Sequence, residues 1–366
     1  MNTKVEALHN MGQSIWLDFI DRKIMDSGEL ERLITEEGIR GITSNPSIFQ
    51  QAISSGNDYD DDIIAASQVL GTNDEIYYSL AVSDIRRAAD LLHHVYNGKT
   101  RGADGYVSLE VSPHYAYNTF ETIFQAKDLW ELVCRENLMI KIPATTEGLP
   151  AIRECIRLGL NVNVTLIFSL TRYREVVNAY LSGLQDRLND GNEIAHIASV
   201  ASFFLSRIDI NIGPLLERKD LGALNGHVAI AMARKAYAIY EECFLGKKFE
   251  QLREHGALPQ RLLWASTAAR DPKMTDTFYI ETLIFPETIN TLNLSTLNAF
   301  FDRGIVDGSM LIGLKAADEI LMLLEENDID LEALATRLED KGVVLFITAY
   351  EEILATIEEQ KTIVRI

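Results

Sequence analysis

The chain has 366 residues, of which 47% are hydrophobic, so it is long enough for one large domain or two average ones. Its formal net charge is −20, with 54 acidic against 34 basic side chains, which argues against nucleic acid or an anionic membrane as a partner. The chain shows no signal-peptide pattern and no apolar run of membrane-spanning length, so we expect a soluble cytoplasmic protein. Its three cysteines, Cys134, Cys155 and Cys243, are widely separated, and we expect them to be reduced core thiols.

Short apolar or β-branched runs alternate with longer helical patterns along most of the chain. We predict eight strands, over residues 14–20, 41–48, 105–113, 138–144, 161–169, 196–208, 261–267 and 278–286. Strands that alternate with helices are typical of a parallel sheet. Because no Gly-rich dinucleotide fingerprint is present, we favour a closed (β/α)8 TIM barrel of the α/β class over an open doubly wound sheet.

Helical patterns continue after the eighth predicted strand. They cover residues 298–301, 313–327, 330–341 and 343–359, and we expect Gly342 to separate the last two helices. We expect these helices to pack on the outside of the barrel; a helix that binds a partner is the alternative. Since no Pro/Gly/Ser-rich linker is visible, residues 1–366 are predicted to form a single barrel domain with inserted helices and a helical extension over about 294–366.

The most informative stretch is residues 138–149, LMIKIPATTEGL, which places Lys141 among apolar residues of a predicted strand. Burial disfavours an ammonium ion and favours the neutral amine, which is a nucleophile able to condense with a carbonyl group. The alternative is a lysine that points outward from a half-exposed strand or that pairs with a carboxylate.

Polar side chains also fall late in the other predicted strands. They are Asp18, Asn45, Glu110, Thr165, Ser202, Arg207 and Ser266. Any one of them alone is more commonly a helix cap or half of an ion pair. In a barrel of this type, however, the active site lies at the carboxyl ends of the strands, so together with Lys141 they predict a pocket with acid and base groups. No metal site is expected, because His93 and His94 are adjacent on a helix and cannot face one ligand.

The whole chain resembles the transaldolases, which are Schiff-base-forming aldol transferases of the pentose phosphate pathway. Two motifs carry the resemblance: GITSNPSI at residues 41–48 and the stretch around Lys141. Shorter segments at 16–18, 108–113, 161–169 and 202–209 support it. The resemblance implies a (β/α)8 barrel with extra helices, sugar phosphates as substrates, and neither a metal nor an organic cofactor.

Catalytic roles follow from the resemblance. It makes Lys141 the Schiff-base nucleophile and Asp18 the base that takes a proton from the C4 hydroxyl group of the donor sugar. Glu110 and Thr165 resemble the pair that holds a water for the proton transfers of imine formation and hydrolysis.

Binding roles follow in the same way. Asn45 and Ser202 would hydrogen-bond the hydroxyl groups of the retained dihydroxyacetone unit. Arg207, Ser266 and Arg270 would contact phosphate. The longer transaldolases often have Lys at the position of Arg270. The alternative for this residue is therefore a solvent-facing arginine paired with Asp271.

The nearest rival is an enzyme similar to fructose-6-phosphate aldolase, which protonates the enamine and releases dihydroxyacetone. Such relatives tend to carry Tyr where this chain has Phe204, and a phenyl ring has no hydroxyl group to deliver that proton. Transfer to an aldose phosphate is therefore favoured. A silent barrel that binds sugar phosphates and a pyridoxal-phosphate enzyme are further alternatives, and the sequence leaves a homo-oligomer open.

Overall fold

Eight parallel strands form a closed barrel in the computed structural model, which describes residues 2–98, 102–271, 273–308 and 313–363. The strands follow the chain order around the barrel and confirm the predicted fold class. They are β1 (Gln13–Asp18), β2 (Gly41–Thr43), β3 (Tyr106–Glu110), β4 (Leu138–Pro143), β5 (Val162–Ile167), β6 (Ser199–Phe204), β7 (Arg261–Ala265) and β8 (Thr288–Leu292).

The prediction of an eighth strand over residues 278–286 is wrong. Phe278–Thr282 forms the short helix α13, and β8 begins only at Thr288. A short apolar run fits a buried helix as well as a buried strand, so its composition could not distinguish the two. The segment after α13 covers the outer side of the sheet, where the Leu283 carbonyl accepts a hydrogen bond from Trp264 Nε1 at 3.1 Å.

Helices surround the barrel wall. They are α1 (Thr3–Asn10), α2 (Arg22–Asp26), α3 (Glu29–Arg32), α4 (Pro46–Ser54), α5 (Asp60–Ser67), α6 (Asn73–Tyr96), α7 (Thr119–Val133), α8 (Gly148–Leu158), α9 (Leu170–Asn189), α10 (Ser206–Arg218), α11 (Val228–Phe244), α12 (Lys247–Glu254), α14 (Leu294–Arg303) and α15 (Leu314–Glu326). Three of them begin just after a strand at a side-chain cap: Asn45, Ser169 and Asn293 accept backbone N–H groups of α4, α9 and α14. These caps turn the chain sharply at the carboxyl ends of the strands.

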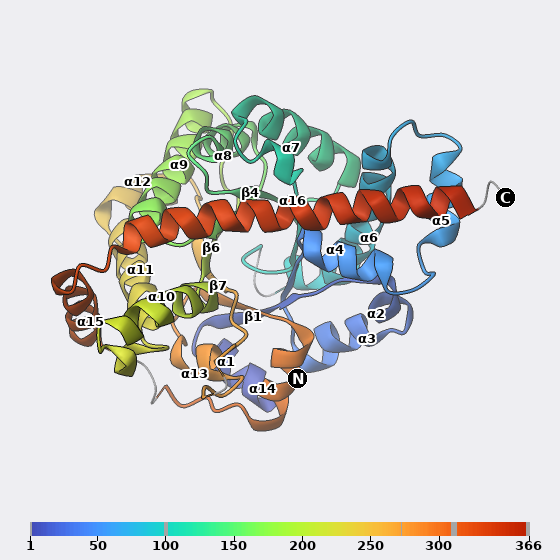
Figure 1. The fold of residues 1–366 in the computed structure, drawn as a ribbon. Coiled ribbons are helices and arrows are strands. Elements are labelled where there is room, and N and C mark those ends of the chain that lie inside the picture. The colour runs from blue at the N-terminus through green and yellow to red at the C-terminus, as the bar shows by residue number, and fades with distance from the viewer. Residues whose placement is uncertain (1, 99–101, 272, 309–312, 364–366) are drawn as a thin grey trace.

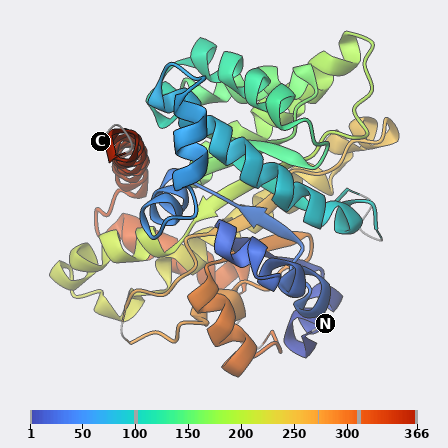
Figure 2. The ribbon, with the colours of Figure 1, turned by 90° about the vertical axis from the view of Figure 1, so that its right-hand side faces the viewer.

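The last helix, α16 (Leu331–Ile363), crosses one end of the barrel instead of packing along its wall. It runs over the full width of the molecule in Figure 1 and is seen nearly end-on at one side of the molecule in Figure 2. The predicted break at Gly342 is wrong, because the helix continues through it. A Cβ atom at Gly342 would lie 2.9 Å from Leu166 Cδ2, so this glycine serves close packing.

The cysteines match the prediction only in part. None of the three forms a disulfide, and Cys155 is buried, but Cys134 is exposed. Cys134 ends α7 in a left-handed conformation with φ 51°, which turns the chain at the surface. Among the described residues, no helix is long and apolar enough to cross a membrane.

A buried ion cluster fills the amino-terminal end of the barrel. The carboxylate of Asp104, which is 2% exposed, accepts hydrogen bonds from Ser14 Oγ at 2.8 Å, Trp16 Nε1 at 3.0 Å and Arg261 Nη1 at 3.1 Å. Ser14 and Arg261 lie at the starts of β1 and β7, so the cluster joins strands from different parts of the ring. The opposite end of the barrel is therefore the one left for a site.

Replacing Asp104 with alanine would leave the Arg261 guanidinium buried without its carboxylate. We expect the free energy of unfolding to fall by about 3–5 kcal/mol, the usual cost of removing one partner of a buried pair. Urea unfolding of Asp104→Ala and of the control Asp128→Ala, at an exposed position on α7, measures the difference. Equal stability of the two variants would contradict a structural role for the cluster.

Candidate active site

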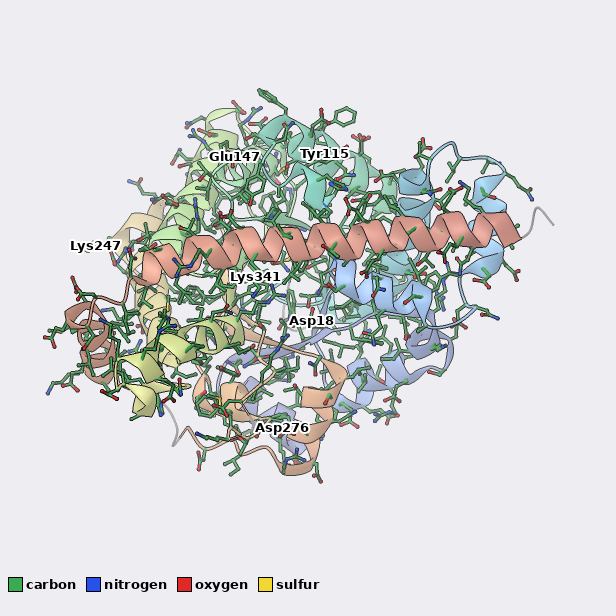
Figure 3. All side chains as sticks on the ribbon, viewed as in Figure 1. Asp18, Tyr115, Glu147, Lys247, Asp276 and Lys341 are labelled. Atoms are coloured by element: carbon green, nitrogen blue, oxygen red, sulfur yellow. The ribbon has the colours of Figure 1, made fainter. Side chains whose placement is uncertain are left out.

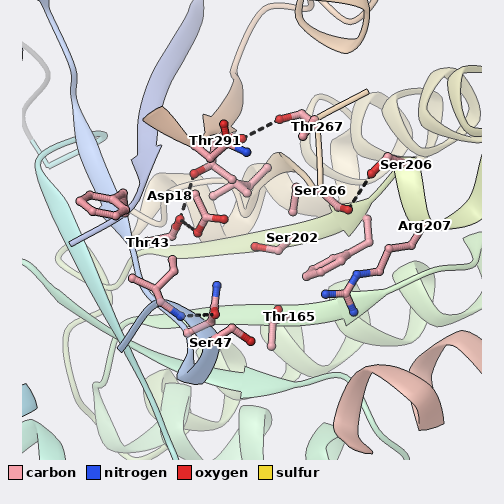
Figure 4. Close-up of a pocket in the computed structure, with 18 of the residues that line it drawn as sticks. Asp18, Thr43, Ser47, Thr165, Ser202, Ser206, Arg207, Ser266, Thr267 and Thr291 are labelled. Carbon is pink, nitrogen blue, oxygen red and sulfur yellow. Dashed lines mark hydrogen bonds between the residues drawn. The ribbon is translucent and has the colours of Figure 1, made fainter. Parts of the chain in front are cut away.

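A pocket of about 400 Å³ opens at the carboxyl ends of the strands. Nine of the ten residues predicted for the site line it: Asp18, Asn45, Lys141, Thr165, Ser202, Phe204, Arg207, Ser266 and Arg270. The tenth, Glu110, is buried next to Lys141. Figure 4 shows that the labelled polar side chains approach the pocket from opposite walls, and in Figure 3 Asp18 lies near the centre of the molecule, below α16 in the picture.

Lys141 lies on β4 and is 4% exposed. Its Nζ donates a hydrogen bond to the Ser44 carbonyl oxygen at 3.0 Å and lies 3.5 Å from Glu110 Oε2. The Nζ atom also lies 5.7 Å from the centroid of the Phe346 ring. The alternative of an outward-pointing lysine is therefore wrong. The alternative of a lysine that pairs with a carboxylate is confirmed, because Lys141 forms an ion pair with Glu110 while its amine faces the pocket.

Glu110 owes its position to strand register, because it is the direct neighbour of Lys141 across the β3–β4 ladder. Burial raises the pKa of Glu110 to about 7, although the positive charge of Lys141 acts in the opposite direction. Apart from Lys141, Glu110 Oε2 has no hydrogen-bond partner in the described part of the chain, and neither has the buried Thr165 Oγ1. Unsatisfied buried oxygens of this kind are suited to binding a water or a ligand.

Asp18 ends β1 on another wall of the pocket. Its Oδ1 accepts a hydrogen bond from Thr43 Oγ1 at 2.7 Å, and Thr43 Oγ1 lies 2.9 Å from Thr291 Oγ1 (Figure 4). Burial raises the pKa of Asp18, while Lys141 and the hydrogen bond from Thr43 act to lower it. This carboxyl is thus fixed in orientation and is suited to exchanging a proton with a bound molecule.

Two arginines give one side of the pocket its positive charge. Arg207 follows β6, and its guanidinium Cζ lies 5.4 Å from the centroid of the Phe204 ring. Burial and the nearby charge of Arg270 lower the pKa of Arg207, and its Nη1 has no hydrogen-bond partner in the structure described. Ser206 Oγ and Ser266 Oγ lie 2.9 Å apart beside them. Arginine forks and hydroxyl groups at the start of α10 form a suitable site for a phosphate.

A chain of hydrogen bonds fixes Ser202. Its hydroxyl group donates to Asn163 Oδ1 at 2.7 Å, and Asn163 Nδ2 donates to Ser108 Oγ at 3.0 Å. The Ser202 oxygen is therefore left to accept from a ligand. Asn45 uses its Oδ1 to cap α4, which leaves its amide Nδ2 as the group available to a ligand.

Sequence reasoning missed several residues that line the pocket: Thr43, Ser47, Ser206, Thr291, Asn293 and Phe346. The first three lie within motifs that were already singled out, so their position near a strand end was the available signal. Thr291 and Asn293 were missed because the eighth strand was placed too early in the chain. Phe346 has no local signal, since it comes from the middle of α16.

No metal site is evident in the described segments, which hold no cluster of three or more His, Cys, Asp or Glu side chains arranged around an ion. The groups that converge on the pocket are instead one amine, two carboxyl groups, two guanidinium groups and several hydroxyl groups. Such a set can form a covalent bond to a carbonyl group, move protons and bind an anion.

Comparisons with known proteins agree with this chemistry. Residues 15–357 match the family model described as transaldolase/fructose-6-phosphate aldolase. A transaldolase of Saccharopolyspora erythraea is 46% identical over 362 residues, which cover 98% of each chain. Transaldolases of Thermobifida fusca and Trichodesmium erythraeum are each 42% identical, over 98% and 96% of this chain and 99% and 96% of their own. The match runs from β1 into α16.

The Glu110 carboxyl group is expected to titrate near pH 7, which carboxyl carbon NMR of labelled protein can measure. Replacing Lys141 with methionine should raise the pKa of Glu110 further, because the ammonium charge that favours the carboxylate is removed. Lys127→Met, at an exposed position on α7, is the control and should leave this pKa unchanged. A lower pKa in Lys141→Met would show that the two side chains do not interact as described.

Proposed function

The chain belongs to the transaldolase/fructose-6-phosphate aldolase family and is a transaldolase, and we propose that Lys141 carries the Schiff base of its reaction. The enzyme transfers a dihydroxyacetone unit from a ketose phosphate, such as sedoheptulose 7-phosphate or fructose 6-phosphate, to an aldose phosphate, such as glyceraldehyde 3-phosphate or erythrose 4-phosphate. This reaction belongs to the pentose phosphate pathway.

One observation supports the role of Lys141 most strongly. Its amine is buried and lies 3.5 Å from the Glu110 carboxyl group. Lys141 also lines the same pocket as Asp18 and Arg207. In its neutral form this amine attacks the donor ketone. Loss of water from the adduct then gives an iminium ion, and a water held between Glu110 and Thr165 would carry the protons of that step.

Cleavage of the donor sugar assigns a second role. Asp18 takes the proton of the C4 hydroxyl group, the C3–C4 bond breaks, and its electron pair moves into the iminium to form an enamine. The aldose phosphate leaves with a new aldehyde group. When the acceptor aldehyde enters, the enamine attacks it and Asp18 returns the proton to the new hydroxyl group.

Substrate binding divides between the two ends of the pocket. Asn45 and Ser202 hold the hydroxyl groups of the retained three-carbon unit near Lys141. Arg207, Ser266 and Arg270 bind the phosphate at the other end. Phe204 lines the same pocket and has no hydroxyl group to supply a proton. We place the enzyme in the cytoplasm, where its three cysteines, none of which forms a disulfide, would stay reduced.

Borohydride reduction in the presence of fructose 6-phosphate tests the Schiff base directly. We expect mass spectrometry to find the reduced three-carbon adduct on Lys141 and to find none in Lys141→Ala. Lys127→Ala, an exposed lysine on α7, is the control and should retain the adduct. An adduct on another residue, or no adduct in the unmodified enzyme, would refute the assignment.

Removal of Arg207 tests the phosphate end of the pocket. Arg207→Ala should raise KM for fructose 6-phosphate by about 10- to 100-fold, because hydrogen bonds to a charged group contribute about 1.5–3 kcal/mol. KM for unphosphorylated fructose should change much less. Arg218→Ala, an exposed arginine at the other end of α10, is the matched control. Equal changes for both sugars would rule out phosphate binding by Arg207.

A further inference from the structure

Phe346 closes the pocket over the reacting amine. It is 4% exposed, it lines the same cavity as Lys141 and Asp18, and the centroid of its ring lies 5.7 Å from Lys141 Nζ. It is the residue that α16 contributes to the pocket wall, whereas the neighbouring pocket residues come from strands and from the loops and helices that follow them.

The helix that carries Phe346 is tied down on both sides of it. In the first part of the helix, Glu332 accepts a hydrogen bond from Thr171, Glu339 pairs with Arg172, and Asp340 accepts a hydrogen bond from Tyr117. In the last part, Tyr350 donates to Asp74, and Lys361 donates to Asn73. Asn73 in turn donates to the Leu354 carbonyl oxygen. The Tyr350 ring also packs edge-to-face against Tyr77, with centroids 5.2 Å apart. Phe346, one turn before Tyr350, is thus held in place on a fixed helix.

Gly342, one turn on the other side of Phe346, sets how closely the helix approaches the barrel. A Cβ atom there would lie 2.9 Å from Leu166 Cδ2. Leu166 itself has a left-handed backbone with φ 60° and directly follows Thr165, which lines the pocket. The contact between α16 and β5 therefore lies beside the catalytic groups.

We propose that Phe346 keeps water away from the enamine on Lys141 and so directs the reaction toward transfer. This inference rests on the proposed function, in which the enamine must wait for an acceptor aldehyde. The competing reaction begins when the enamine carbon takes a proton from water, which forms a C–H bond and leaves hydroxide. The protonated enamine is an iminium ion, to which a second water adds. That water loses a proton to the hydroxide, the C–N bond breaks, and dihydroxyacetone and the free amine are released.

A phenyl ring suits this task because it occupies the space of several water molecules and has no proton to give. Its face can also attract the iminium charge, since Lys141 Nζ lies within the distance at which cations and aromatic rings interact. The two effects can be separated. Leucine retains apolar volume but lacks the ring face, whereas alanine retains neither.

The test measures two products from fructose 6-phosphate and erythrose 4-phosphate: sedoheptulose 7-phosphate from transfer and free dihydroxyacetone from release. In Phe346→Ala we expect the ratio of release to transfer to rise by a factor of about ten or more, which corresponds to a change in relative barrier of about 1.4 kcal/mol. Phe346→Leu should restore most of the original ratio. Leu345→Ala, on the adjacent residue that is 44% exposed, should not change it.

Gly342→Ala provides a second variant that leaves Phe346 intact. The added methyl group should push α16 away from Leu166 and so raise the ratio of release to transfer. When the reaction is run in D₂O, the released dihydroxyacetone should carry deuterium at the former enamine carbon. An unchanged ratio in both Phe346→Ala and Gly342→Ala would overturn the inference, as would an equal rise in Phe346→Leu and Phe346→Ala.

Borohydride trapping separates failure of this inference from failure of the proposed function. If the Lys141 adduct forms in the unmodified enzyme but the product ratio does not respond to Phe346→Ala, only the shielding role is wrong. If no Lys141 adduct forms in the unmodified enzyme, the Schiff-base proposal fails and the shielding role fails with it.

Discussion

Lys141 and Glu110 occupy paired positions on neighbouring strands, so the buried amine that lines the pocket has a buried carboxyl group 3.5 Å away. Burial of the Glu110 carboxyl group favours its neutral form, while the positive charge of Lys141 favours the carboxylate. The balance leaves the pKa of Glu110 at about 7, where the group can accept or donate a proton near neutral pH. The other groups of the site are arranged around this pair.

Barrel closure brings the remaining groups to that pair. Asp18 ends β1 and Arg207 follows β6, and they meet across the cavity because the sheet returns on itself from β8 to β1. Beneath the pocket, polar side chains of the barrel interior satisfy one another, from Ser202 through Asn163 to Ser108, and the Asp104 cluster fills the far end. The interior is thus polar but hydrogen-bonded, which holds the catalytic ends of the strands in place.

The long helix α16 gives the site its cover. Its polar contacts with α6 and with the start of α9 fix its position, and the absence of a side chain at Gly342 lets it lie directly on Leu166. Phe346 then reaches a pocket whose other lining residues lie earlier in the chain, from Asp18 to Asn293. Gly342, which the sequence pattern predicts to separate two helices, therefore allows close packing in the fold.

Local sequence was enough for most of the barrel and for the residues at its strand ends. Alternating apolar runs and helical patterns predicted the fold class. Polar residues late in those runs marked six of the residues that line the pocket, and the apolar surroundings of Lys141 marked a seventh, whereas Phe204 and Arg270 came from the family resemblance. The eighth strand was misplaced because FYIETLIF is apolar enough for either a helix or a strand, and this error hid Thr291 and Asn293.

The sequence by itself determined which residue types stand at the ends of the strands, because the pattern that specifies each strand also specifies its last residues. Only the tertiary structure decided that Glu110 lies beside Lys141, that Thr43 orients Asp18, and that Phe346 covers the amine. Those relations depend on strand register, on closure of the sheet and on the path of a distant helix, and such long-range contacts leave no trace in the order of neighbouring residues.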